Sequence, residues 1–522
     1  MEAWMKHTIK PCQLTILLLI FVLFSLRPAA AESRESGLFF PDSSPISSTG
    51  TVKVGLFGIG LNTYWEQFPG LRDRLESYLK TIEKKISEAG GCQVISAGLV
   101  DTVEKARETA GIFRATGVRI IFLYVSTYAL SSTVLPVVEE ARVPVVVLNL
   151  QPEAAINYEW FNSLGDRGQM TGEWLAFCQA CAVPEIASVF NRSGIDFHLV
   201  TGTLQDPEAW NEIQEWVEAA RVAEVLHQLN LGVLGHYYNG MLDVYTDTTR
   251  LAASLGLHLE NLEIGQLIEL RHQVSQKEIA NKIQEMEKSF NILPEASRAE
   301  IERAAGTACA LERLVAQKKL GALAYYYEGT PGSEEEDIVT SLIAGCSLLT
   351  AKHVPMAGEC EVKNAVAMKI MDSFGAGGSF TEFYALDFKE GIILMGHDGP
   401  GHIAIAEGKP QLKPLGVFHG KPGKGLSIEM KVKSGPVTLL SVVETRDNQL
   451  KLLVAEGESV PGPILQIGNT NSRYRFKPGV KEFVEAWSQE GPAHHCAVGV
   501  GHIASKIKKL AAILGVKFVQ IS

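Results

Sequence analysis

Short, almost continuously apolar runs alternate with segments of helical periodicity from Val52 onward. The apolar runs are VKVGLFGIG, CQVISAGLV, RIIFLYV and VPVVVLNL. Between them, LRDRLESYLKTIEKKISEAGG, VEKARETAGIFRATG and LPVVEEAR repeat apolar residues at the spacing of amphipathic helices. Strands that are apolar on both faces are typical of a parallel sheet covered by helices on both sides. The pattern predicts one doubly wound, Rossmann-like α/β domain over residues 51–190.

A second alternation begins near LNLGVLGH and predicts another doubly wound, parallel-sheet domain over residues 191–355. We expect its helices in DTTRLAASLG, QKEIANKIQEMEKSF, SRAEIERAAGTACALERLVAQKK and DIVTSLIAGCSLLTAK, with a strand at ALAYYYE.

The pattern changes in the last third of the chain, residues 356–522. The runs GIILMGH, HIAIAEG, LSIEMKVKSGPVTLLSVVET and QLKLLVAEGE follow one another with Gly and Pro turns and without helices between them. Strands in series predict a mainly antiparallel, β-barrel-like C-terminal domain. A final helix and strand are expected in HIASKIKKLAAILGVKFVQI.

The first 31 residues have the pattern of a secretory signal peptide. Lys6 and Lys10 precede the apolar run LTILLLIFVLFSL, and the small residues Ala29 and Ala31 follow it. The run is shorter than the ~20 apolar residues of a spanning helix, so no stable membrane span is expected after cleavage. Residues 32–50 are predicted to be a Ser/Pro/Gly linker. We therefore expect a secreted or periplasmic protein. Two alternatives stay open. The segment could be an uncleaved membrane anchor, or the start of the chain could be wrongly assigned, in which case the protein would be cytoplasmic.

Length and charge narrow the class of protein. The chain has 522 residues, and single cores stop growing at roughly 250–300 residues, so several domains are expected. Its hydrophobic fraction of 46% and charged fraction of 20% are those of an ordinary folded protein. The formal charge of -11 argues against a nucleic-acid surface, which needs clustered Lys and Arg.

Eight cysteines are present, and cleavage of the leader would leave seven. An odd, scattered set in a large chain is not a disulfide framework. Cys178 and Cys181 form a CxxC motif in the helix-like stretch GEWLAFCQACAV, with no second CxxC to complete a zinc site. Buried free thiols are the simplest interpretation, and a disulfide or redox role is the alternative.

Candidate catalytic and metal-binding groups gather in the last third of the chain. Glu359 follows a Pro/Gly turn, Glu382 lies where a Gly-rich loop meets an apolar strand, His397 ends another strand, and His494–His495 precede the last helix. Each has a structural explanation when it is taken alone, as a first-turn carboxylate, a salt-bridge partner or a strand-end histidine. Their spacing does not join them into one site.

Four segments in the same order resemble the L-arabinose/L-fucose isomerase family. GECEVKNAVAMKIM, SFTEFYALDF, ILMGHDGPGH and AHHC are similar to the family's GEGDWKTAALLRIM, SFMEDYTYHF, VLGSHM-like strand end and AHHT. The resemblance implies that Glu359, Glu382, His397 and His495 bind a divalent metal, with Mn²⁺ the first choice. It also implies that Glu359 and Glu382 are the catalytic proton-transfer pair.

The likeness continues upstream more weakly. GHYYNGMLDVYTDTTRLAASLG is similar to the family's G-x-M-x-D/E segment, which makes Met241 a substrate-binding candidate. Asn62 and Tyr64 stand in the place of a family S-Q-H-L-Y motif whose Gln is missing here. By resemblance, the site lies between subunits of a homo-oligomer, Asn62 and Tyr64 contact the sugar of a neighbouring chain, and His494 orients a ligand or binds a hydroxyl.

These observations predict an intramolecular oxidoreductase that interconverts an open-chain aldose and ketose. Proton transfer between C1 and C2 would pass through an enediol, assisted by a divalent cation. The substrate is an L-arabinose-like pentose or a related sugar, and the altered sugar-contact residues leave its identity open. The alternatives are a periplasmic sugar-binding protein and a non-catalytic relative of the sugar isomerases.

Overall fold

The computed structural model describes residues 51–418 and 421–522. The predicted signal peptide, residues 1–31, and the linker, residues 32–50, lie outside the described residues. Among the helices of the described ranges, none combines the length and the apolar character that crossing a bilayer requires.

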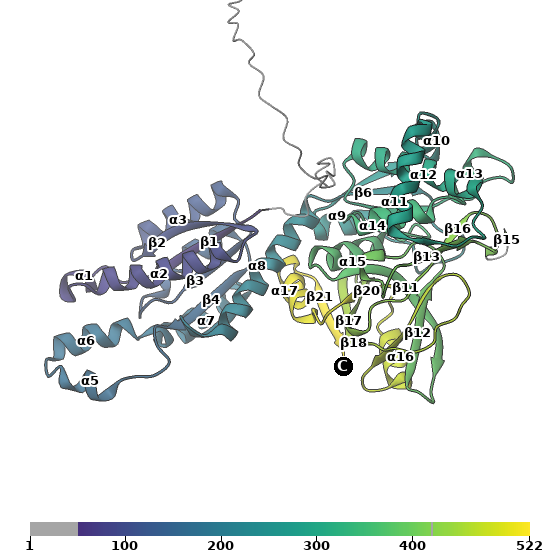
Figure 1. Ribbon diagram of the computed structural model, residues 1–522. Helices are drawn as coiled ribbons and strands as arrows, with labels where there is room; N and C mark the ends of the chain where they lie inside the picture. Colours follow the sequence, from purple (N-terminus) through teal and green to yellow (C-terminus); the bar gives the residue numbers. More distant parts are fainter. Residues whose placement is uncertain (1–50, 419–420) are drawn as a thin grey trace, which may run out of the picture. The chain divides into compact units, whose positions relative to one another are not determined.

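The N-terminal sheet has five parallel strands in the order β2-β1-β3-β4-β5 (Figure 1). They are β1 (Val52–Ile59), β2 (Cys92–Val100), β3 (Ile120–Tyr124), β4 (Val145–Gln151) and β5 (Phe197–Thr203). β3 is buried along its whole length, as its unbroken apolar sequence predicts. The outer strand β5 lies C-terminal to residue 190, where the sequence pattern places the end of the first domain.

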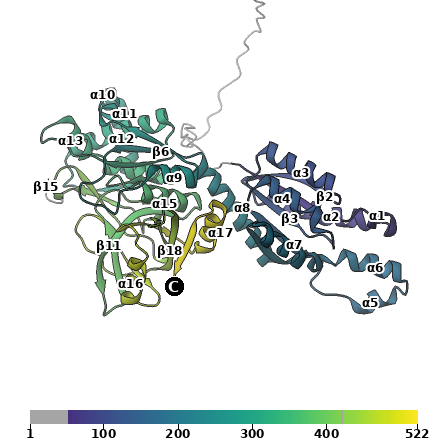
Figure 2. The same ribbon diagram turned by 180° about the vertical axis from the view of Figure 1, so that it is seen from behind.

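Helices cover both faces of this sheet, so it has two cores (Figures 1 and 2). α2 (Leu71–Glu88) and α8 (Pro207–His227) contribute to one core. α3 (Val103–Thr116), α4 (Leu135–Ala141) and α7 (Gln179–Ser193) contribute to the other. The remaining short elements are α1 (Tyr64–Gln67), a 3-10 turn (Ser131–Thr133), α5 (Tyr158–Ser163) and α6 (Arg167–Ala176).

A second parallel sheet has the strand order β10-β9-β6-β7. Its strands are β6 (Asn230–Gly235), β7 (His258–Leu262), β9 (Ala322–Tyr326) and β10 (Met356–Ala357). The helices of this region are α9 (Thr248–Leu255), α10 (Ile264–His272), α11 (Gln276–Ser289), α12 (Arg298–Lys318), α13 (Glu334–Val339), α14 (Ile343–Ala351) and α15 (Val362–Ser373). Every residue of α15 is buried.

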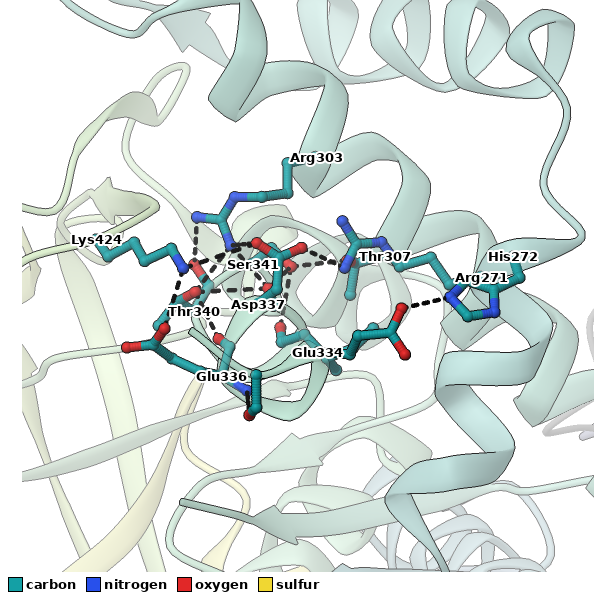
Figure 3. Close-up of polar contacts among 12 residues, drawn as sticks. Arg271, His272, Arg303, Thr307, Glu334, Glu336, Asp337, Thr340, Ser341 and Lys424 are labelled. Carbon is teal, nitrogen blue, oxygen red and sulfur yellow. Dashed lines mark hydrogen bonds and ion pairs between the residues drawn. The ribbon is translucent and has the colours of Figure 1, made fainter. Parts of the chain in front are cut away.

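The single helix expected over DIVTSLIAGCSLLTAK is wrong, because α13 and α14 are separated at residues 340–342. Hydroxyl groups bond back to the backbone at the break: Thr340 Oγ1 donates to Glu336 O at 2.7 Å and Ser341 Oγ to Asp337 O at 2.8 Å. Such bonds compete with continued helix. Arg303 of α12 reaches the same break and donates to Asp337 O at 2.7 Å (Figure 3). The break is therefore fixed from the neighbouring helix.

Six antiparallel strands form a closed C-terminal barrel in the order β17-β20-β11-β12-β19-β18, because β17 also pairs with β18. They are β11 (Gly377–Asp387), β12 (Ile392–His397), β17 (Gly435–Glu444), β18 (Leu450–Ser459), β19 (Thr470–Phe476) and β20 (His495–Val500). With α16 (Val480–Gln489), α17 (Ala504–Leu514) and β21 (Lys517–Ile521), which adds to β18, they complete the domain. Two parallel α/β sheets followed by an antiparallel barrel confirm the predicted fold class.

A small side sheet pairs β16, β13 and β8. The elements are β8 (Asn291–Ile292), β13 (Gln411–Pro414) and β16 (Leu426–Glu429), beside a hairpin of β14 (Val417–Phe418) and β15 (Lys421–Pro422). The strand expected at HIAIAEG is wrong: this segment forms a 3-10 turn (Ile403–Ile405). Its alternating pattern finds no neighbouring strand beyond one isolated bridge between Ala406 and Val432.

Candidate metal centre

A left-handed turn between β10 and α15 positions Glu359. Glu359 has φ 55° and Cys360 has φ 57°, a conformation that L residues seldom adopt. Such residues cost of order 1–3 kcal/mol each and persist only when their surroundings fix them. Here Cys360 N donates to Tyr325 O at 3.0 Å, and Glu361 N donates to Gly358 O at 3.0 Å. The backbone thus fixes the carboxylate-bearing residue before the helix begins.

Three neighbouring barrel strands bring the other groups together. In the β11–β20 pair Glu382 lies opposite His495, and in the β11–β12 pair it lies opposite Gly396, next to His397. Because directly opposed residues of antiparallel strands have close Cβ atoms, this register places one carboxylate and two imidazoles at the same end of the barrel.

The ligand atoms form two overlapping groups that share His495. One group is Glu359, His397 and His495, and the other is Glu382, His494 and His495, with the ligand atoms of each within 4.8 Å of one another. Glu359 Oε2 lies 3.3 Å from His495 Nε2, and Glu359 Oε1 lies 3.9 Å from His397 Nε2. The four predicted ligands therefore lie close together in the folded protein, and His494 lies beside them.

Phe380 packs between two of the imidazoles. Its ring centroid lies 4.5 Å from that of His397 and 4.3 Å from that of His495. Phe380 is buried, so the rings rest on a fixed apolar surface. Contacts of this kind limit the orientations that the two histidines can adopt.

Glu361 contacts the ring nitrogen of His495 that is not the one next to Glu359. The two are buried, and Glu361 Oε2 lies 2.6 Å from His495 Nδ1. Burial raises the pKa of Glu361 to about 8 and lowers the pKa of His495 to about 2, so burial favours the neutral form of both groups. A metal ligand needs the tautomer in which Nδ1 carries the ring proton, Glu361 accepts that bond as a carboxylate, and Nε2 presents a lone pair toward Glu359.

Asp243 acts in a similar way on His494, from the loop that follows β6. Its Oδ2 accepts from His494 N at 3.0 Å and lies 2.6 Å from His494 Nδ1. Burial lowers the pKa of His494, but the bond to Asp243 and the nearby carboxylates outweigh it, and the net pKa is raised. His494 Nε2 lies 3.8 Å from Glu359 Oε2 and 3.9 Å from Glu382 Oε2, so this imidazole stands between the two carboxylates.

The carboxylates themselves are electrostatically coupled. Burial raises the pKa of Glu359 to about 7, and the charges of Glu382 and Glu361 add to the rise while His494 opposes it. Clustered carboxylates of this kind repel one another until a cation or a proton neutralises them.

The arrangement fits a divalent cation. Glu359 Oε2 and His495 Nε2 are buried, and neither has a hydrogen-bond partner within the described ranges. A buried polar atom without a partner is costly, and a cation between these atoms would satisfy both. Carboxylate oxygens combined with imidazole nitrogens are a ligand set that suits ions such as Mn²⁺.

Three predicted substrate-binding residues lie elsewhere. Tyr64 in α1 packs edge-on against Phe68 at 5.9 Å between ring centroids, and Asn62 is exposed just before it. Met241 lies in the same loop as Asp243, where its N–H donates to Tyr238 O. Asn62 and Tyr64 belong to the segment that follows β1 of the N-terminal sheet, whereas the metal ligands come from the turn after β10 and from the barrel.

Sequence reasoning missed Glu361 and Asp243 as members of the site. Glu361 lies two residues after Glu359, and Asp243 is the acidic residue of the G-x-M-x-D segment. Both therefore lie within segments that resemble the isomerase family. What the sequence lacked was the pairing of each carboxylate with one histidine some 130 or 250 residues away, which only the fold reveals.

Comparison with known proteins identifies the relatives of this site. The family described as L-arabinose isomerase C-terminal domain matches residues 377–517, which include Glu382, His397, His494 and His495. Across 345 residues the chain is 22% identical to an L-arabinose isomerase of Shouchella clausii, covering 65% of this chain and 69% of the relative.

Two further relatives give the same result. The chain is 25% identical over 344 residues to an L-arabinose isomerase of Serratia proteamaculans, covering 62% of this chain and 66% of the relative. It is 27% identical over 319 residues to one of Klebsiella pneumoniae, covering 57% of this chain and 61% of the relative. The chain thus spans somewhat less than two thirds of these two relatives. The C-terminal match and the longer, low-identity matches show that this chain is similar to L-arabinose isomerases, above all in the domain of residues 377–517.

Proposed function

We propose that this protein is a metal-dependent isomerase that interconverts an open-chain aldose and its ketose. The observation that carries the proposal is the convergence of two carboxylates and three imidazoles at one end of the barrel, all but Glu359 within the domain that matches the family. The relatives are named L-arabinose isomerases, which supports an L-arabinose-like pentose or a related sugar as the substrate.

Glu359, Glu382, His397 and His495 would hold the cation. A divalent ion such as Mn²⁺ would supply electrophilic polarisation of the two substrate oxygens that take part in the reaction. Glu361 keeps His495 in its ligand tautomer, and Phe380 keeps the ring in place.

Glu359 and Glu382 would move the proton between C1 and C2. Aldose–ketose interconversion removes a proton from one carbon and returns it to the other, while the hydroxyl and carbonyl exchange places. His494 lies at nearly equal distances from the two carboxylates and is fixed by Asp243. It is therefore placed to hold a substrate hydroxyl or to stabilise either carboxylate in its charged form.

The remaining sugar contacts are proposed to come from Met241 and from a second subunit. Met241 shares its loop with Asp243, which bonds to His494. Asn62 and Tyr64 are assigned to the neighbouring subunit of a homo-oligomer, as the resemblance to the isomerase family implies. The N-terminal pattern supports a secreted or periplasmic location for the assembly.

The decisive experiment is a sugar panel. Pentoses, 6-deoxyhexoses and hexoses are incubated with the Mn²⁺-loaded protein, and ketose formation is measured. Glu359→Gln and Glu382→Gln should each lower kcat by at least ~100-fold, since each removes a proton-transfer group. Glu485→Gln, on the exposed side of α16, is the matched control and should leave kcat unchanged.

Two outcomes would contradict the proposal. Turnover of either variant within tenfold of the parent would remove that glutamate from the mechanism. Sugar binding of equal strength with and without metal, and without ketose formation, would instead support a sugar-binding protein.

A further inference from the structure

The CxxC motif lies at the start of a long helix, and the proposed sugar site does not use it. Cys178 is the N-cap residue of α7, with φ -92° and ψ 43°, and Cys181 is the third residue of that helix. Cys178 is 3% exposed, whereas Cys181 is exposed to solvent. The pair therefore combines one accessible and one inaccessible sulfur.

Helix geometry brings these two sulfurs together. The side chain of an N-cap residue approaches the backbone N–H and the side chain of the third helical residue, as in a capping box. Cys178 and Cys181 occupy the N-cap and third helical positions of α7, so only two residues of the first turn separate them. A C-x-x-C spacing in this register places both thiols within one helical turn.

We propose that Cys178 and Cys181 are a redox-active pair that closes to an intramolecular disulfide by exchange with a small aliphatic disulfide such as oxidised glutathione. The proposal is independent of the proposed isomerase activity.

The exchange takes two balanced steps. The Cys181 thiolate attacks one sulfur of the small disulfide, whose S–S bond breaks and releases one small thiol, leaving a mixed disulfide on Cys181. Cys178 then gives up its proton and attacks the Cys181 sulfur, which expels the second small thiol. Two cysteine thiols are thereby oxidised to one disulfide, one small disulfide is reduced to two thiols, and two protons pass from the cysteines to the released thiols.

The order of the steps follows from accessibility. Cys181 is exposed and meets the small disulfide first. Burial raises the pKa of Cys178 to about 12, and its interaction with the Cys181 thiol adds to the rise. A mixed disulfide on Cys181 removes that second contribution and lies within one helical turn of the Cys178 thiol. The second attack is therefore intramolecular, and it falls to Cys178.

The test uses the full chain in glutathione buffers of graded oxidation state. Free thiols are trapped by alkylation in denaturant, and the peptide that contains residues 178–181 is analysed by mass spectrometry. We expect both cysteines to become protected together as the buffer becomes more oxidising, and to be released together by reductant. Cys92→Ser, which removes a half-buried thiol of the same domain, is the control and should not change the midpoint.

The single variants separate a closed pair from unrelated oxidation. Cys178→Ser should accumulate a glutathione adduct on Cys181, and Cys181→Ser should leave Cys178 reduced at every ratio. Because Cys181 is exposed, its variant keeps the test valid even when Cys178→Ser does not fold. Alkylation of both thiols at the most oxidising ratio, or a disulfide that joins either one to Cys92, would overturn the proposal.

Discussion

Glu361 shows how one buried carboxylate determines what a metal ligand can do. Its carboxylate is hydrogen-bonded to His495, 2.6 Å away, and both side chains are buried. A buried carboxylate is costly unless it is paired. Its position behind the ring, on the side away from Glu359, explains why the fold retains it: it determines which nitrogen of His495 faces the other ligands.

Glu361→Gln should weaken metal binding while leaving the fold intact. The amide keeps an oxygen that can accept from His495 Nδ1 but cannot take the negative charge that Glu361 carries when a cation is bound, so the ring becomes a poorer donor to that cation. We expect Mn²⁺ affinity, measured by calorimetry, to fall by about 10–100-fold. Glu485→Gln should bind Mn²⁺ as the parent does, and equal affinities of the parent and Glu361→Gln would show that Glu361 does not support His495.

The stability of the protein should depend on pH through a helix cap outside the site, at the start of α11. Ser275 and Glu278 form a capping box: Glu278 N donates to Ser275 Oγ at 3.3 Å, and Ser275 N donates to Glu278 Oε2 at 2.9 Å. The bonds from the Ser275 hydroxyl and N–H, followed by Arg313, lower the pKa of Glu278 to about 2. The charged carboxylate is therefore the form that the folded helix start prefers.

Because the folded pKa is below that of an unfolded glutamate, about 4.3, this group stabilises the fold above that pH. The contribution is lost as the pH falls from about 4 toward 2. Urea midpoints should therefore be lower for Glu278→Gln than for the parent at pH 6, and the difference should shrink near pH 3. A difference that stays constant with pH would show that the charge of Glu278 plays no part in the cap.

The elements of the two α/β regions could be predicted from the sequence because each carries its own signal. β3 is apolar throughout, β4 begins with four apolar residues, and α3 ends at Gly117, whose φ of 70° suits a helix end. The strand order of the barrel could not be predicted, because β20 pairs with β11 and β17, which are distant from it in the sequence. The α13–α14 break depends on Arg303, which lies more than thirty residues earlier in the chain.

The candidate site was predictable only in part, for the same reason. A resemblance supplied Glu359, Glu382, His397 and His495 as a set, and the register of β20, β11 and β12 brings the last three together. The supporting carboxylates have no local signal: Glu361 reads as a helix-start acid. Their roles arise from contacts across the fold, which periodicity does not encode.

At the scale of the whole molecule, the site joins two sheets. Asp243 comes from the loop after β6, Glu359 and Glu361 from the turn after β10, and the remaining groups from the barrel. A cation held there would link the second parallel sheet to the barrel. Such a link stabilises the folded state by about 2.7 kcal/mol when the free ion is at a hundredfold excess over its Kd.

Removal of the metal should consequently lower the local stability of the site's elements more than that of the N-terminal sheet. After chelation and dialysis, we expect hydrogen exchange to speed up at β11, β20 and the turn after β10, and to remain unchanged in β1, β3 and β4 of the N-terminal sheet. Mn²⁺ should restore the protection in the parent and in Glu485→Gln. In Glu382→Gln, which loses one carboxylate ligand, it should restore less.

The comparison of the two variants separates a specific site from general ion effects. An ion that binds exposed acidic groups would protect both variants alike, because each has lost one carboxylate. An ion held at the barrel end discriminates between them, because Glu382 lies opposite His495 across the β11–β20 pair whereas Glu485 lies on the outside of α16. Equal restoration in both variants, or uniform protection that includes the N-terminal sheet, would mean that no cation joins the turn after β10 to the barrel.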